Sequence, residues 1–349
     1  MKILAIDTSC DETSAAVTEG RRVLANVIYS QILIHKKWGG VVPSLAKRAH
    51  EERIDLVIDE ALKNLGFVSI SLPPMKSIDA IAVTYGPGLA VALEVGIKKA
   101  KEMAIKYNKK IIAINHMEGH IYSVFTQNSK GNPKQDFNFP YLVLLVSGGH
   151  TELVLFEDHL RYKIIGQTID DAAGEALDKA AKMLGFGYPG GPIIERLAQE
   201  VNNKDYFKFP RPMLKSQDLN FSFSGLKTAF YYFIKKMPES DKNKQLKELV
   251  SSFQEAVFDS LIKKTEKAIK LTKINHLVIS GGVSANLYLR KKFRQLVESN
   301  GGTVLLPPYK YLTGDNAAMI GVAAHYHVMK NDFVKDLNRL DRVPRLTLT

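Results

Sequence analysis

Cysteine is almost absent from this chain of 349 residues, which contains only Cys10. No internal disulfide can therefore form, and a reducing compartment is the simpler expectation. The sequence also lacks a run of about 20 apolar residues, the length that a membrane-spanning helix requires. Its first residues enter an apolar segment, Ile3–Ile6, without the cationic stretch, long apolar run and cleavage site of a secretory signal. We therefore expect a cytoplasmic protein.

Acidic residues are outnumbered, because 48 Lys and Arg face 36 Asp and Glu and leave a formal net charge of +12. Clustered positive charge favours a polyanionic partner, since binding to phosphates releases counterions. A lysine-rich proteome would produce the same excess, and many of these lysines fall on predicted helices where water solvates them. Both interpretations stay open at this point.

Apolar segments typical of strands alternate with segments of helical periodicity. At about 150 residues per domain, 349 residues correspond to two domains. Predicted strands cover 3–7, 14–18, 23–29, 78–84, 111–114, 142–156 (two strands around a polar turn), 162–166, 276–280 and 303–306; predicted helices cover 43–64, 89–106, 174–184, 193–201, 224–236, 245–271, 284–299 and 316–329. The alternation predicts an α/β protein with a central sheet.

The second half of the chain repeats the beginning. Segments 3–17 and 142–156 are both fifteen residues long, and each reads as strand, polar turn and strand, followed by a third strand. An internal duplication explains this, and two related halves predict a site in the cleft between them. We therefore predict an N-terminal lobe at 1–136, a C-terminal lobe with a helical insertion at 137–330, and a tail at 331–349.

His116 and His120 directly follow an apolar segment and stand four residues apart. In a helix they project from one face, close enough to bind one metal ion, although surface or capping roles stay open on this motif alone. Glu118 lies between the histidines, which differs from the His-Glu-x-x-His pattern of zinc peptidases. Asp315, just before Asn316, is either a helix N-cap or a third metal ligand.

Three polar or glycine-rich turns follow predicted strands, at 7–12, 147–150 and 280–286. Such turns let backbone N–H groups approach an anion, so three of them favour nucleotide binding, although single glycine turns commonly serve hairpins. The Walker pattern is missing, which disfavours a P-loop. Among the acids near residue 174, Asp170 and Asp171 are explained as complements to a helix dipole, and Asp178 is the better ligand candidate.

These motifs together resemble the tRNA threonylcarbamoyladenosine transferases, in the bacterial and organellar branch of that universal family. The matching segments run in family order: 8–13 (TSCDET), 39–43 (GGVVP), 86–89 (GPGL), 116–120 (HMEGH), 146–151 (VSGGHT), 170–175 (DDAAGE), 188–192 (YPGGP), 221–228 (FSFSGLKT), 281–286 (GGVSAN) and 315–316 (DN). They cover nearly the whole chain, so the resemblance is highly specific.

The resemblance implies a duplicated actin-like, ribonuclease H-like ATPase fold of two lobes with a central cleft. It implies one divalent metal, Fe²⁺ or alternatively Zn²⁺, held by His116, His120 and Asp315. It also implies contacts with an adenylate or ATP-type nucleotide from a set of eight residues: Leu145, Val146, Ser147, Gly148, Gly149, Asp178, Gly191 and Asn286.

Members of this family are acyltransferases. They move threonylcarbamoyl from threonylcarbamoyl-AMP to N6 of the adenosine 3′ of the anticodon, in tRNAs that read codons beginning with A. The implied partners are tRNA, an inactive paralogous subunit and a small ATPase, while a separate synthase supplies the intermediate. Our candidate acceptor for the N6 proton is Asp11 or Glu12, because both lie in the turn that follows the first predicted strand.

The chain departs from the family pattern at Ser44, where a glutamate is usual, and in a longer loop at 128–138. Ser44 leaves any role of that glutamate in doubt. Two functions other than threonylcarbamoyl transfer are also considered. A metallopeptidase would use the paired histidines, but Glu118 is misplaced for it. A non-catalytic scaffold of the same fold, like the paralogous subunit, would lack the histidine pair that this chain retains.

The positive charge predicts that tRNA binding weakens steeply with salt, because each lysine or arginine that neutralises a phosphate releases a counterion. With about six phosphate contacts, the dissociation constant rises roughly 10³-fold between about 50 and 200 mM salt. Titration of labelled tRNA at several salt concentrations measures this slope. A dissociation constant that does not change with salt would mean that a partner protein supplies the tRNA surface.

Overall fold

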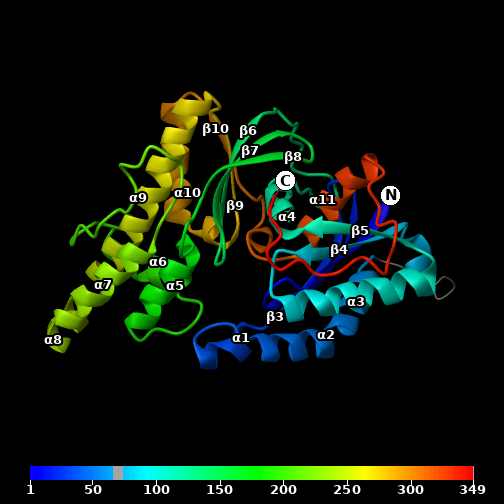
Figure 1. Ribbon diagram of the computed structural model, residues 1–349, viewed down its shortest axis with the longest axis horizontal. Helices are drawn as coiled ribbons and strands as arrows, with labels where there is room; N and C mark the ends of the chain where they lie inside the picture. The colour runs from blue at the N-terminus through cyan, green and yellow to red at the C-terminus, as the bar shows by residue number, and fades with distance from the viewer. Residues whose placement is uncertain (66–73, 349) are drawn as a thin grey trace. The chain divides into compact units, whose positions relative to one another are not determined.

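The computed structural model describes residues 1–65 and 74–348, which form two compact units (Figure 1). Unit 1 comprises Met1–Phe137 and Pro307–Thr349, and unit 2 comprises Asn138–Leu306. The boundary between Phe137 and Asn138 lies next to the predicted boundary between residues 136 and 137. The predicted second lobe includes 307–330, whereas this segment belongs to unit 1, because the helix α11 (Ala317–Met329) packs on the sheet of unit 1.

Unit 1 is built on a five-stranded mixed sheet in the order β3-β2-β1-β4-β5. Its strands are β1 (Lys2–Asp7), β2 (Glu12–Glu19), β3 (Arg22–Ser30), β4 (Ala80–Gly86) and β5 (Lys110–Asn115). The first three strands form an antiparallel meander, while β4 is parallel to β1 and β5 is parallel to β4. All the strands predicted here are confirmed.

Unit 2 repeats this topology. Its sheet has the order β10-β9-β6-β7-β8, with strands β6 (Tyr141–Val146), β7 (Thr151–Asp158), β8 (Arg161–Gln167), β9 (His276–Ser280) and β10 (Thr303–Leu305). Again the first three strands are antiparallel and the last two run parallel to the first. The duplication expected from the repeated strand-turn-strand pattern is therefore present in the connectivity of both sheets.

The sheet of unit 1 is covered on both faces, as its buried central strand requires. Leu4 and Ile6 of β1 pack in one cluster with α2 (Pro43–Lys63) and α3 (Ala90–Tyr107). The alternating residues of β1, also buried, point to the opposite face. There α11 contacts β1, β2, β3 and β5, and it also packs against α4 (His116–Ser123).

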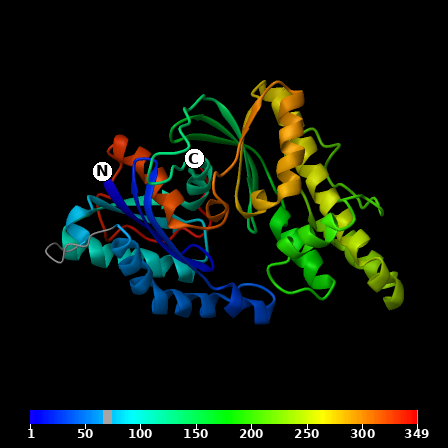
Figure 2. The same cartoon turned by 180° about the vertical axis from the view of Figure 1, so that it is seen from behind.

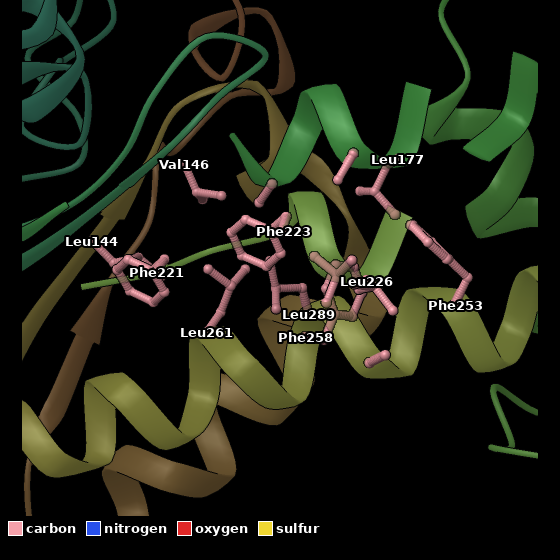
Figure 3. Packing of buried hydrophobic residues seen from close by; sticks show 14 of the residues in the cluster. Leu144, Val146, Leu177, Phe221, Phe223, Leu226, Phe253, Phe258, Leu261 and Leu289 are labelled. Carbon is pink, nitrogen blue, oxygen red and sulfur yellow. The ribbon is translucent and has the colours of Figure 1, made fainter. Parts of the chain in front are cut away.

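The helices of unit 2 are α5 (Ala173–Met183), α6 (Gly191–Gln199), α7 (Ser224–Lys236), α8 (Glu239–Lys244), α9 (Leu246–Thr272) and α10 (Leu287–Ser299). All of them except α8, which has no buried residue, contribute to a large apolar cluster. Phe221 and Phe223 lead into α7 and meet Phe253 and Phe258 of α9 in this cluster (Figure 3). The two views of the ribbon show α9 and α10 side by side (Figures 1 and 2).

The C-terminal tail has neither helix nor strand among residues 331–348, yet it is an integral part of unit 1. Val334 N donates to Ile111 O at 2.9 Å, and Val343 N donates to Tyr85 O at 2.7 Å. The tail passes so close to Gly86 that a Cβ there would lie 2.0 Å from Val343 O. Throughout the described part of the chain, none of the helices has the length and apolar character needed to cross a membrane.

Two leucines of α9 test the role of the unit 2 cluster. Leu261 is fully buried in it, whereas Leu271 on the same helix is 62% exposed. Leu261→Ala should lower the free energy of unfolding by about 2–5 kcal/mol through lost burial and a residual cavity. Leu271→Ala should change it by less than about 0.5 kcal/mol. Urea unfolding measures both, and equal effects would contradict the assignment of the core.

Candidate functional site

Two buried histidines stand on one face of α4 in unit 1. The helix begins as soon as β5 ends, because Asn115 Oδ1 accepts a hydrogen bond from Met117 N at 2.9 Å and caps it. His116 and His120 are therefore one helical turn apart, and their ring centroids lie 4.7 Å from each other. The prediction that the histidines share a helix face is confirmed.

Asp315 joins the histidines from the start of α11. Its Oδ1 lies 3.3 Å from His116 Nε2 and 3.2 Å from His120 Nε2. The N-cap of α11 is Asn316, whose Oδ1 accepts from Met319 N at 3.0 Å, so the cap role weighed for Asp315 belongs to its neighbour. One ligand atom from each of the three residues lies within 4.8 Å of the others. Two imidazole nitrogens and a carboxylate oxygen fit a divalent transition metal.

A second carboxylate, Asp7, lies beside this cluster at the end of β1 and is fully buried. Its Oδ2 is 3.7 Å from His116 Nδ1, and its Oδ1 accepts from Ser9 N at 3.2 Å. No donor within residues 1–65 and 74–348 hydrogen-bonds to Asp7 Oδ2, which is unusual for a buried oxygen. The sequence pattern indicated Asp7 only as the start of a turn. The available signal for a buried role was an acid directly after the apolar segment Ile3–Ile6.

Burial and charge pairing act against each other in this cluster. Burial disfavours the charged form of His116, but Asp315 and Asp7 outweigh it and raise the pKa of His116 to about 9. Burial lowers the pKa of His120. For Asp315 the two histidines outweigh burial and hold the pKa of the carboxyl well below its usual range. Without a metal, the cluster therefore contains a charged carboxylate and one charged imidazole at neutral pH.

The turn between β1 and β2 is fixed by a side chain of α2 and by the backbone of α3. His50 of α2 is buried, and its Nε2 donates to Cys10 O at 3.0 Å while its Nδ1 accepts from Thr13 Oγ1 at 2.7 Å. Thr8 Oγ1 donates to Ala92 O of α3 at 2.9 Å. The turn is thus held at both ends in a defined conformation.

Glu12 of this turn interacts electrostatically with Asp315 of the histidine cluster. Burial, together with the charges of Asp11 and Asp315, raises the pKa of Glu12. Ser30 Oγ donates to Glu12 Oε1 at 3.4 Å. A carboxyl whose pKa is raised holds its proton closer to neutral pH, which suits exchange of a proton with a substrate.

In unit 2 the turn Ser147–His150 presents two glycines to the outside. Ser147 N donates to His150 O at 2.9 Å, and His150 N donates to Ser147 Oγ at 3.1 Å. Gly148 and Gly149 are exposed, and a Cβ added at either residue would have no atom within 4 Å. Leu145 and Val146, the preceding residues of β6, are fully buried. The open backbone of this turn is accessible to an anion.

Asp178 and Gly191 are in direct contact. Asp178 Oδ1 accepts from Gly190 N at 2.7 Å and from Gly191 N at 3.0 Å, so this side chain of α5 caps the N-terminus of α6. Asn286 caps α10, since its Oδ1 accepts from Leu289 N at 2.9 Å. The helix predicted from residue 284 consequently begins at 287, after a 3₁₀ turn at Gly282–Ala285.

The turns after β6 and β9 meet. Gly281 has a positive φ of 91°, and a Cβ there would lie 2.5 Å from Val146 O. Gly174, at the start of α5, approaches Ser147 O as closely, at 2.5 Å from its own Cβ position. The turns after β6 and β9 and the start of α5 thus lie together at the carboxyl ends of these strands, the usual place of a ligand in an open α/β sheet.

Asp170 serves a different helix from the one expected. Asp170 Oδ1 accepts from Phe223 N at 2.8 Å and from Ser224 N at 3.2 Å, and its Oδ2 accepts from the hydroxyls of Ser222 and Ser224. Asp171 pairs with Lys227 of α7 and, at 3.2 Å, with Lys179 of α5. The predicted complement to the dipole of α5 is therefore wrong for Asp170, which caps α7 instead. The contact of Asp170 with the start of α7 joins segments that are distant in the sequence, so no local pattern around Asp170 indicates it.

The family model described as tRNA N6-adenosine threonylcarbamoyltransferase matches residues 22–322. The chain belongs to this family. A curated relative with that name from Thermosipho melanesiensis is 47% identical over 348 residues, all of both chains. Another from Geotalea uraniireducens is 47% identical over 95% of this chain and 92% of its own length. The resemblance and the predicted enzyme class, a transferase, are confirmed.

Among solved structures, HypF from T. kodakarensis has a TM-score of 0.60 at 13% identity. The match covers 96% of this chain and 48% of HypF, so this chain spans about half the length of that protein. At this identity the likeness concerns the fold alone. Together with the membership of the family, it confirms the predicted duplicated actin-like α/β fold.

The cap that Asp170 forms predicts a pH-dependent loss of stability. Burial opposes its charged form, but four hydrogen bonds outweigh burial and lower the pKa of Asp170. A lowered pKa in the folded state means stability that is present above the unfolded value and is lost as pH falls. Asp170→Asn should cost about 1 kcal/mol at pH 7 and much less near pH 3. Urea unfolding at both pH values measures this, and an equal cost would contradict the cap.

Proposed function

We propose that the protein transfers threonylcarbamoyl from threonylcarbamoyl-AMP to N6 of the adenosine 3′ of the anticodon, in tRNAs that read codons beginning with A. Membership of the family supports the reaction, since relatives named for it match the chain over its whole length. The observation that carries the chemistry is the cluster of two buried histidines, His116 and His120, with the half-buried Asp315 in unit 1.

His116, His120 and Asp315 are the proposed ligands of one divalent metal, Fe²⁺ or alternatively Zn²⁺. The meeting of their ligand atoms within 4.8 Å supports this assignment. Such an ion, when bound, polarises a carbonyl oxygen as a Lewis acid, an effect worth several kcal/mol. The N6 amine of adenine is a weak nucleophile because its lone pair is delocalised, so activation falls mainly on the carbamoyl group. His120, neutral because burial lowers its pKa, is ready to act as a ligand.

The adenylate is proposed to bind through unit 2. The residues are those implied by the family motifs: Leu145, Val146, Ser147, Gly148, Gly149, Asp178, Gly191 and Asn286. The exposed backbone of Gly148 and Gly149 supports phosphate binding, because N–H groups there can approach an anion without a side chain in the way. The helix N-termini at Gly191 and Asn286 add partial positive charge.

Asp11 and Glu12 are the proposed acceptors of the N6 proton. Support comes from the raised pKa of Glu12 and from its electrostatic interaction with Asp315. Its raised pKa makes Glu12 a stronger base than an ordinary exposed carboxylate. AMP is a good leaving group and requires no general acid.

The proposed partners are tRNA, an inactive paralogous subunit and a small ATPase, with a separate synthase as the source of threonylcarbamoyl-AMP. The name of the family supports tRNA as substrate. The net charge of +12 is consistent with a polyanionic substrate. We propose the cytoplasm as the place of this reaction.

A metallopeptidase is less well supported by the geometry. In that reaction Glu118 would have to serve as general base near the metal ligands. Instead Glu118 Oε2 accepts a hydrogen bond from His327 Nε2 at 2.9 Å. A non-catalytic scaffold is disfavoured because the buried cluster of two histidines and an aspartate is intact.

Substitution of a proposed ligand should abolish transfer. His116→Ala or Asp315→Ala removes one of three ligands, and we expect a loss of about 10³-fold, equivalent to about 4 kcal/mol. The assay measures labelled threonine incorporated into tRNA with synthase, ATP, bicarbonate and partners, with and without a chelator. Asp158→Ala, an exposed carboxylate of β7, is the control and should leave transfer unchanged. Normal transfer by either ligand variant would contradict the assignment of His116 and Asp315 as metal ligands.

A further inference from the structure

Glu118 lies between the two proposed metal ligands in sequence but on the other side of α4 in space. Residues two positions apart on a helix are separated by about 200° around its axis, so Glu118 points away from the face of His116 and His120. The side chain is nonetheless buried, with 4% of the residue exposed. A buried carboxylate requires a strong partner, and Glu118 accepts a hydrogen bond from His327 Nε2 at 2.9 Å.

His327, in the last turn of α11, binds carboxylates with both ring nitrogens. Nε2 donates to Glu118, and Nδ1 donates to Asp332 Oδ2 at 2.8 Å. Burial disfavours a charged ring, but Glu118 and Asp332 outweigh it and raise the pKa of His327 to about 9. Because both nitrogens donate, the ring is an imidazolium whose orientation is fixed at two points.

The two helices that this ion pair joins carry all three proposed ligands. His116 and His120 stand on α4, and Asp315 directly precedes α11. Asp315 and His327 are twelve residues apart, which corresponds to roughly 18 Å along a helix. Residues 315–327 therefore contact α4 through a charged group at each end. Asp315 lies against His116 and His120, and His327 binds Glu118.

Between these ends the two helices pack tightly. A Cβ on Gly119 would lie 2.7 Å from Ile320 Cδ1, so the small residue permits close approach. The ring of Tyr122 stacks on that of Tyr326, with centroids 4.6 Å apart and an angle of 12° between the planes. These contacts set the distance between the helices. The hydrogen-bonded pair of Glu118 and His327 adds a directional, charged contact to them.

We propose that the ion pair of Glu118 and His327 is a positioning device for the metal centre, which fixes the rotation of α4 so that His116 and His120 face Asp315. This inference rests on the proposed metal site. If α4 turned about its axis, the carboxylate and the imidazolium would separate inside the protein, where an unpaired charge is strongly disfavoured. Glu118 and His327 are thus positioning residues, which do not contact the substrate.

The test uses Co²⁺ as the probe with the full-length, metal-free protein. The variants are Glu118→Gln, His327→Gln and the double variant, with Asp332→Asn as matched control. Asp332 binds the same histidine from its exposed side, where a pair of charges contributes little. Three quantities are measured for each: the Co²⁺ dissociation constant, the visible absorption spectrum at saturating Co²⁺, and the unfolding midpoint of the metal-free protein.

Each single variant should raise the Co²⁺ dissociation constant about tenfold and change the spectrum, because the ligand geometry is less well held. The double variant should lose no more Co²⁺ affinity than either single variant, because each single variant already breaks the pair. Its two amide side chains keep a neutral hydrogen bond, which favours folding. Asp332→Asn should bind Co²⁺ as the unmodified protein does. A purely structural role would lower the unfolding midpoint without changing the spectrum.

An unchanged dissociation constant and spectrum in the folded double variant, or in either single variant, would overturn the positioning role. His116→Ala distinguishes this failure from failure of the metal site itself. If His116→Ala loses Co²⁺ while the Glu118 and His327 variants bind normally, only the role of the ion pair is wrong. If His116→Ala also binds Co²⁺ normally, the proposed ligand set is wrong.

Discussion

The contact of one carboxylate, Asp315, with two buried imidazoles is the interaction on which the architecture of unit 1 depends. Taking these groups out of water is costly, and only close pairing compensates for it. The pairing requires that a segment near the C-terminus returns to the helix that follows β5. The assignment of 307–349 to unit 1, the close packing of α11 on α4 and the course of the tail all accompany this contact.

The two units have the same strand topology but different chemistry at their strand ends. Unit 1 presents acids and imidazoles there, among them Asp7 at the end of β1 and His116 after β5. Unit 2 presents glycines and helix N-termini, such as Gly148 after β6 and Asn286 before α10. Acids and imidazoles suit a cation, while exposed backbone N–H groups suit a phosphate. We therefore propose the metal site in unit 1 and the phosphate site in unit 2, on two units of the same strand topology.

Local patterns were sufficient to predict most elements and the relation of His116 to His120. Strands and helices follow from the spacing of apolar residues, and two histidines four apart on a helix share a face whatever surrounds them. The failures concern contacts between distant segments. Asp170 caps α7 rather than complementing α5, and the segment 307–330 joins unit 1. Glu118 had no role until the position of His327 was known, because nothing local to the motif indicates a partner on another helix.

The central claim is that His116, His120 and Asp315 bind one divalent metal. Anomalous diffraction at the absorption edge of iron or zinc, from crystals of the protein loaded with that metal, tests it most directly. We predict a peak bonded to the Nε2 atoms of both histidines and to an oxygen of Asp315, at about 2.0–2.2 Å. A fully loaded protein whose anomalous peak lies elsewhere, away from these three side chains, would contradict the claim.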